Sequence, residues 1–114
     1  MERMSVLERT PPHPDVSAFD LQQVLEALVD PVRRGIVAQL ASSGEDIACG
    51  GFGLTVSKST ATHHFKVLRE AGVIRQYYVG TSRMNALRRA DMDTAFPGLL
   101  DAITVAHGSR RSPA

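Results

Sequence analysis

Apolar side chains recur at intervals of three and four residues in four stretches of the chain, which predicts four helices that each bury one face. The first helix is expected to follow a cap at Asp15 or Ser17. The second opens at Asp30, because the next residue is a proline. The last is expected to run from Pro97 to Gly108. The inward positions are Leu21, Val24, Leu25 and Leu28, then Val32, Ile36 and Leu40, then Ala61, His64, Phe65 and Leu68, and finally Leu99, Ala102, Ile103 and Ala106.

The third helix is the best marked, because both of its ends carry a signal. Ser57 is a good N-cap, since its hydroxyl accepts a hydrogen bond from a first-turn N–H, and Gly72 suits the position just past the end. The face opposite the apolar stripe is polar and has no carboxylate before Glu70. Such a face fits the major groove of DNA, although an ordinary solvated helix surface has the same pattern. Its residues are Ser59, Thr62, His63 and Lys66.

Two segments beside this helix lack helical periodicity. Residues 43–56 contain four glycines, so any helix there is expected to be short and distorted. Residues 73–79 are rich in β-branched and aromatic side chains, and with a return over 83–87 they predict a hairpin. Residues 80–83 would form its tip, which brings Arg83 within reach of a nucleic-acid backbone or minor groove. Helices followed by a hairpin predict a mainly α fold with a small β-hairpin, the winged helix-turn-helix.

The chain of 114 residues fits one domain of this kind. Residues 1–14 end in a proline-rich run and are expected to form a flexible arm. Residues 15–107 would form the DNA-binding and dimerisation domain. Residues 108–114 are expected to form a disordered tail.

The net charge of +1 predicts little, but the cations are unevenly distributed. Glu70 is the one acidic residue between Ile47 and Ala90, which is the footprint expected of a phosphate-binding surface. Chance clustering would give the same pattern. Arg33 and Arg34, near the start of the second helix, are expected to face solvent. The cations between residues 47 and 90 are Lys58, Lys66, Arg69, Arg75, Arg83, Arg88 and Arg89.

Several classes of protein are unlike this sequence. No apolar run approaches the roughly 20 residues of a membrane span, and the first residues lack the apolar core of a signal peptide, so a cytoplasmic protein without membrane contact is expected. Ser57 or Ser59 with His63 has the residue types of a nucleophile and base, but an exposed helix offers no cleft to exclude water. The glycines at 50–53 lack the Lys and Ser/Thr of a phosphate loop. No catalytic activity is expected.

The histidines and the single cysteine have more specific expectations. His63 and His64 diverge by about 100° on a helix, so they do not share a metal ion, and His64 is expected to be a hydrogen-bonded core residue. Cys49 lies among glycines next to the predicted DNA-reading helix. It is either a small buried hydrophobe or a redox sensor whose modification would shift that helix.

Two motifs resemble the ArsR-type bacterial repressors. Residues 28–37, LVDPVRRGIV, are similar to the opening motif of that family, and residues 57–74, SKSTATHHFKVLREAGVI, to its recognition-helix signature. Residues 87–89 and 96–101 resemble the end of one branch of the family. The resemblance implies a homodimer joined through the first and last helices. It also implies a double-stranded DNA operator with two-fold symmetry, and release by an inducer that the resemblance does not identify. A small molecule or, from the residues themselves, a redox signal at Cys49 is the candidate inducer.

The resemblance also assigns roles to individual residues. Lys58, Ser59, Thr62, His63 and Lys66 match the DNA-facing positions of the family, and Arg83 matches a wing position approximately. The metal-sensing sites of the family are not matched, because a thiolate pair needs a second cysteine and the last helix offers only Asp101 and His107. No metal or cofactor is therefore expected.

The dimer contact is expected to involve the first and last helices, although some of its candidate residues must instead fill the monomer core. Because winged helices also bind proteins, a protein–protein interaction module is the alternative to a DNA-binding regulator. The candidate interface residues are Leu21, Leu25, Leu28, Leu99 and Ile103.

Overall fold

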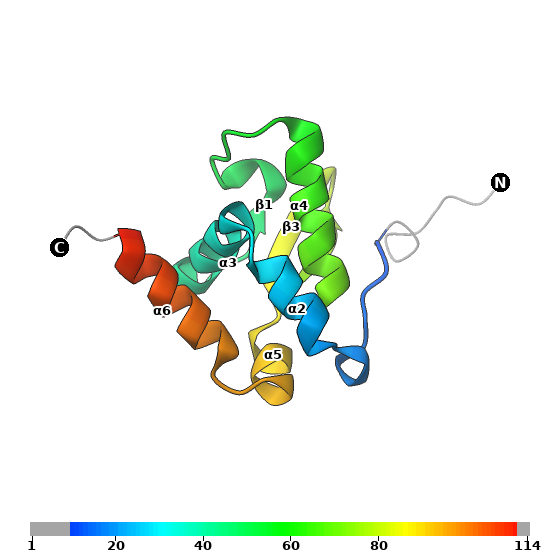
Figure 1. The fold of residues 1–114 in the computed structure, drawn as a ribbon. Helices are drawn as coiled ribbons and strands as arrows, with labels where there is room; N and C mark the ends of the chain where they lie inside the picture. The colour runs from blue at the N-terminus through cyan, green and yellow to red at the C-terminus, as the bar shows by residue number, and fades with distance from the viewer. Residues whose placement is uncertain (1–9, 112–114) are drawn as a thin grey trace.

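The computed structural model describes the chain from residue 10 to residue 111. Helices α2, α3, α4 and α6 are the longest elements of the molecule, and α2 lies between α3 and α4 with the strands behind α4 in the view of Figure 1. Helix α6 packs along α3, and α4 packs against α2 and β2. The elements are the short 3-10 helix η1 (Val16–Ala18), α2 (Leu21–Leu28), α3 (Pro31–Ser43), β1 (Ile47–Ala48), the 3-10 helix η2 (Cys49–Gly51), α4 (Lys58–Ala71), β2 (Ile74–Val79), β3 (Ser82–Leu87), α5 (Arg89–Ala95) and α6 (Leu99–Arg111).

The sheet has three antiparallel strands in the order β1-β3-β2, which confirms the mainly α fold and adds one strand to the predicted hairpin. Strand β1 pairs Ile47 with Asn85, whereas the sequence indicated only irregular chain there. Gly80 and Thr81 alone form the turn, and Gly80 has a φ of 62°. Arg83 therefore lies within β3, opposite Tyr78, and its expected place at the tip is wrong.

Three predicted helix boundaries are confirmed by their caps. Asp30 accepts hydrogen bonds from the N–H groups of Val32 and Arg33, at 2.8 and 3.2 Å, and opens α3. Ser57 accepts from the N–H of Thr60 and opens α4. Gly72, with a φ of 90°, ends it.

The first and last helices differ from expectation at their ends. Asp15 caps only η1, and the cap of α2 is Asp20. Helix α6 continues through Gly108 to Arg111, because a single glycine weakens a helix without necessarily ending it. The expected arm is in part anchored to the domain, since the guanidinium of Arg88 donates to the carbonyl of Pro14. Residues 1–9 and 112–114 lie outside the described part of the chain, as do the predictions made for them.

The core is a continuous apolar cluster contributed by most elements, so one hydrophobic centre holds the helices against the sheet. No helix in the described chain is long and apolar enough to cross a membrane. The core residues with no exposed surface are Val24, Ala27, Ile36, Val37, Leu68, Val73, Ile74, Met92 and Leu100.

Candidate nucleic-acid interface

Five polar side chains are exposed on α4, and this set is called the reading face. Ser59, Thr62, His63 and Lys66 are presented because Phe65 and Leu68, on the opposite side, are buried in the core. Lys58 lies seven residues before Phe65, on nearly the same side of the helix, and is exposed because it belongs to the first turn. All five were expected to be exposed from the sequence, and the structure places them together on one element. The reading face consists of Lys58, Ser59, Thr62, His63 and Lys66.

The hydroxyl of Thr62 is already engaged within the helix. It donates to the carbonyl oxygen of Lys58 at 2.9 Å. Because a hydroxyl has one proton and two lone pairs, Thr62 still has an acceptor and a methyl group to offer. Such a group fits the amino group of adenine or cytosine, or the methyl group of thymine.

The first turn of α4 carries a cluster of hydroxyls that orients Ser59. Ser57 Oγ accepts from the N–H of Thr60 and donates to the Thr60 hydroxyl at 2.9 Å. The hydroxyl oxygen of Ser59 lies 3.3 Å from Ser57 Oγ. The residue that caps the helix therefore also fixes a candidate base-contacting side chain.

The two neighbouring histidines have opposite environments, as predicted. His63 is exposed, whereas His64 is buried and its Nδ1 lies 3.1 Å from a guanidinium nitrogen of Arg33. Since a guanidinium only donates, Nδ1 accepts and the ring proton of His64 is on Nε2. His64 thus belongs to the structure that holds α4 and not to the reading face.

Arg33 and Arg34 are half-buried and hydrogen-bonded to the backbone, whereas both were expected to face solvent. Arg33 donates from Nε to the carbonyl of Ala27 at 2.6 Å, and Arg34 donates to the carbonyls of Leu28 and Val29 at 2.9 and 2.8 Å. The last carbonyls of a helix lack partners within it, so these cations cap the end of α2.

Several cations of the basic stretch serve the fold, and the positive surface is narrower than the sequence suggested. Arg88 pairs with Asp91 at 2.9 Å, and Arg89 pairs with Asp101 at 3.0 Å. Within the described residues, no ion pair involves either lysine of the reading face. Lys58 and Lys66 are therefore available to an external anion.

Arg83 is held on the side of the sheet that faces α4. Its guanidinium donates to the hydroxyl of Tyr78 at 2.7 Å and lies 5.2 Å from the centre of that ring. An arginine fixed in this way loses less side-chain entropy on binding an anion. The partner role of Tyr78 was not foreseen, because the pairing register across the hairpin was unknown.

A buried polar network connects α4 to all three strands, and sequence reasoning missed it. Arg69 donates to Gln76 Oε1 at 2.7 Å, and Gln76 Nε2 donates to Asn85 Oδ1 at 2.8 Å. Asn85 Nδ2 donates to the carbonyl of Ile47 at 3.1 Å and lies 3.3 Å from Cys49 Sγ. Gln76 and Asn85 are fully buried, although strand amides usually face solvent.

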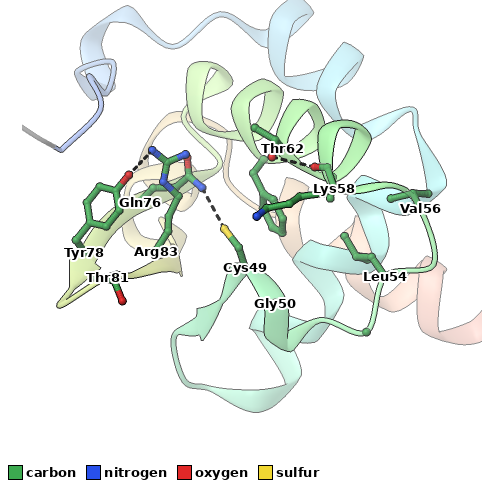
Figure 2. Close-up of a pocket in the computed structure, with 13 residues that line it drawn as sticks. Cys49, Gly50, Leu54, Val56, Lys58, Thr62, Gln76, Tyr78, Thr81 and Arg83 are labelled. Atoms are coloured by element: carbon green, nitrogen blue, oxygen red, sulfur yellow. Dashed lines mark hydrogen bonds between the residues drawn. The ribbon is translucent and has the colours of Figure 1, made fainter.

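The hairpin of β2 and β3 is called the wing. A cleft of about 670 Å³ opens between the first half of α4, the segment around η2 and the side of the wing that faces α4. Figure 2 shows Lys58 on the helix side of this cleft and Arg83 on the sheet side, with Cys49 between them. Its walls include Leu54, Val56, Ala61 and Phe65, so the interior is largely apolar. Ser57, Ser59 and His63, which have the residue types of a nucleophile and base, do not line this cleft.

The remaining candidate chemistry is sparse. Cys49 is half-buried at the start of η2. Among the described residues no three potential ligands gather into a metal site. Asp101, one of the two last-helix residues named above for a metal site, accepts a hydrogen bond from Arg89 at 3.0 Å.

The candidate dimer residues divide between surface and core, which the sequence could not decide. Leu21 and Leu25 are 46% and 43% exposed, whereas Leu28 is 3% exposed and belongs to the monomer core. Leu99 and Ile103 are half-buried against that core. The outer side of α2 thus keeps an apolar surface, to which Val29, also exposed, contributes.

A helical domain with a reading helix followed directly by a two-strand wing defines a winged helix-turn-helix protein. The chain is 35% identical over 83 residues to the uncharacterized HTH-type transcriptional regulator YceK of Bacillus subtilis, a match that spans 71% of this chain and 83% of that protein. The chain therefore belongs to the HTH-type transcriptional regulators.

Two solved structures share the fold. The crystal structure of an ArsR family transcriptional regulator superposes with a TM-score of 0.59 at 24% identity, over 79% of this chain and 92% of the other. That of a possible transcriptional regulator for arsenical resistance gives 0.58 at 22% identity, over 82% and 100%. The fold is of the ArsR type, as the sequence resemblance implied. No family model matches the chain.

Proposed function

We propose that the protein is a homodimeric repressor that binds a two-fold symmetric DNA operator and is released by an inducer. The observation that carries the proposal is the reading face, which is exposed, contains two lysines and has no carboxylate. Family membership supports a role in transcription.

In this proposal the side chains divide into positioning and reading groups. Lys58, Lys66 and Arg83 contact phosphates and place the dimer on the duplex. Ser59, Thr62 and His63 contact base edges in the major groove. The list of proposed contacts is thus the same as that expected from the sequence, with Arg83 acting from the side of the wing and not from its tip.

The two copies are proposed to meet along α2 and α6, through Leu21, Leu25, Leu99 and Ile103. Two reading faces would then enter successive major grooves about 34 Å apart. Leu25→Glu is expected to give a monomer in sedimentation equilibrium and to abolish cooperative operator binding. Val79→Glu, the same change at another exposed apolar residue, should leave the dimer intact.

The first test of DNA binding is footprinting on the DNA upstream of the gene that encodes this protein. Fluorescence anisotropy with the protected fragment then measures the affinity. Lys66→Ala should weaken binding to all sequences and reduce the salt slope by about one. Arg75→Ala is the matched control. Arg75 is exposed but alternates with Gln76 and Tyr78 along β2, so it lies on the sheet side away from α4, and its loss should change affinity little.

The second test separates the residues proposed to contact base edges from those proposed to contact phosphates. Thr62→Val keeps the methyl group but removes the acceptor, so discrimination at one base pair should fall by about 1–3 kcal/mol while random-sequence binding is kept. Thr62→Ser keeps the acceptor. This variant should therefore retain more of the discrimination than Thr62→Val if the base pair is recognised through a hydrogen bond. His63→Ala should relax specificity in the same manner as Thr62→Val.

Equal losses on operator and random duplex for Thr62→Val and His63→Ala, like those expected for Lys66→Ala, would contradict the base-contacting roles of Thr62 and His63. Absence of any salt-dependent duplex binding would instead favour the protein-binding alternative.

A thiol signal at Cys49 is the alternative to a small-molecule inducer. Cys49 Sγ lies at the end of the buried network and lines the cleft, so an alkyl group on it would displace Asn85 or enter the space between α4 and the wing. Alkylation with iodoacetamide is expected to weaken operator binding by the wild type and to leave Cys49→Ser unaffected. Unchanged affinity of the alkylated protein would remove Cys49 as a sensor.

A further inference from the structure

We propose that the cleft between α4, η2 and the wing binds a small amphipathic organic anion, with an apolar body inside and an acidic group at the mouth. We propose further that this ligand and the DNA backbone compete for the same residues. This second step rests on the proposed DNA-binding function, whereas ligand binding itself does not.

The interior of the cleft suits an apolar body. Leu54 and Val56 line it from the segment before α4, and Ala61 and Phe65 line it from the helix. Its volume of about 670 Å³ falls within the range of about 300–1,000 Å³ that is typical of small-molecule sites.

The mouth of the cleft suits an acidic group. Lys58 and Arg83 are the cations of the lining, and none of the lining residues is acidic. Tyr78 holds the guanidinium of Arg83 in place at 2.7 Å, while the hydroxyl-bearing residues Thr62 and Thr81 lie at the same cleft. A carboxylate, sulfonate or phosphate on the ligand would therefore meet two cations and the hydroxyl of Thr81, whereas the hydroxyl proton of Thr62 is already donated to the carbonyl of Lys58.

The cleft and the proposed DNA surface share three residues, namely Lys58, Thr62 and Arg83. An anion bound to these side chains removes the positive charge that the phosphate backbone needs and occupies the space between helix and wing. Because thermodynamic linkage is reciprocal, bound DNA must lower the affinity for the anion by the same factor by which the bound anion lowers the affinity for DNA. The cleft is thus a place for an inducer to act without any change in the dimer.

The test uses 8-anilinonaphthalene-1-sulfonate, a fluorescent anion with an aromatic body, added to the full chain. Binding is followed by fluorescence and by amide shifts in the ¹H–¹⁵N spectrum. Saturable binding with one site per chain is expected, with the largest shifts at Gly50, Gly53 and Thr81. Shifts concentrated on α2, at Leu21 and Leu25, would overturn the proposal, because they would place the probe on the exposed apolar helix surface.

Two matched variants separate filling of the cleft from general effects on the segment. A side chain at Gly50 meets no atom within 4 Å at its Cβ, so Gly50→Leu should fold and fill part of the cleft. It is expected to weaken the probe at least tenfold. Thr55→Leu, an exposed residue of the same segment that does not line the cleft, should leave probe affinity unchanged. Equal affinity in both variants would overturn the proposal.

Competition is measured by anisotropy of a short labelled duplex at increasing probe concentration. Wild-type protein should release the duplex as the cleft fills, and Gly50→Leu should need at least tenfold more probe. Release at the same probe concentration in both would contradict the competition. A protein that binds the probe in the cleft but no duplex would contradict the proposed function and leave the ligand site standing.

Discussion

Helix α4 and the segment that precedes it, residues 44–56, are held in place by different means. Helix α4 has its signals within its own sequence, in the cap at Ser57, the apolar stripe and the stop at Gly72. The preceding segment is tethered from outside. Gln39 Nε2 donates to the carbonyl of Phe52 at 3.1 Å, and Asn85 Nδ2 donates to that of Ile47 at 3.1 Å.

The difference shows that forming the reading helix and aiming it are separate tasks. The rings of Phe52 and Phe65 lie 5.4 Å apart, so the segment supports α4 through an aromatic contact. The segment also forms one wall of the cleft, so whatever loosens it changes the space between helix and wing.

The largest effect is expected from Phe52→Ala, because Phe52 is buried and its truncation leaves a cavity at the contact between the segment and α4. The free energy of unfolding should fall by about 3–5 kcal/mol in denaturant titration. Hydrogen exchange should rise first in residues 47–53 and later in α4. Phe52→Leu should cost less, and equal exchange in both regions would contradict the comparison.

Gly72→Ala should come next, since two costs add at this residue. A φ of 90° is unfavourable for alanine by about 1–2 kcal/mol, and the new Cβ would lie 2.3 Å from the Phe19 ring. We expect a loss of more than about 2 kcal/mol by thermal or denaturant unfolding. Gly44→Ala, at a φ of 67° with open space around it, measures the backbone cost alone. Equal losses in the two variants would show that Phe19 yields freely.

Ser57→Ala is expected to cost about 1 kcal/mol, because it removes the cap that opens α4. Ser59→Ala, in the same turn but without a cap bond to the backbone, should change the free energy of unfolding by less than about 0.5 kcal/mol. Circular dichroism and urea titration measure both. If the two variants lose stability equally, the local cap is not what begins the helix.

The smallest effect concerns His13, whose Nε2 accepts from the N–H of Gln76 at 2.9 Å. Burial lowers the pKa of His13, and nearby Arg69, Arg88 and Arg75 lower it further. The folded state thus resists protonation, so stability is complete above the ordinary pKa of about 6.5 and declines as the pH falls below it. His13→Gln should remove this part of the decline in unfolding titrations at about pH 7 and about pH 5. An unaltered pH profile would exclude this role.

Features with local signals could be predicted from the sequence, including the caps at Asp30 and Ser57, the stop at Gly72 and the exposure of the reading face. Features that depend on register could not. Strand β1 has two residues, and its pairing with β3 leaves no pattern of its own. The register places Gln76 and Asn85 opposite each other on the side of the sheet that α4 covers, so both are buried, whereas polar residues in a strand ordinarily indicate a solvated side.

The exposure of the candidate site residues on α4 could be predicted from the sequence, but the shape of the cleft beside them could not. Exposed polar positions on one helix follow from periodicity, whereas the cleft requires three segments to meet. Arg33 and Arg34 looked solvated because the sequence did not show that the start of α3 brings both side chains back to the last carbonyls of α2.

Arg33 connects helix α2 to helix α4. One guanidinium reaches the carbonyls of Glu26 and Ala27 at the end of α2 and the ring of His64 on α4. If two copies meet along α2 as proposed, a movement at that contact would reach α4 through these hydrogen bonds of Arg33. The angle between the two copies of α4 would then depend on how each Arg33 holds its own α2 and α4.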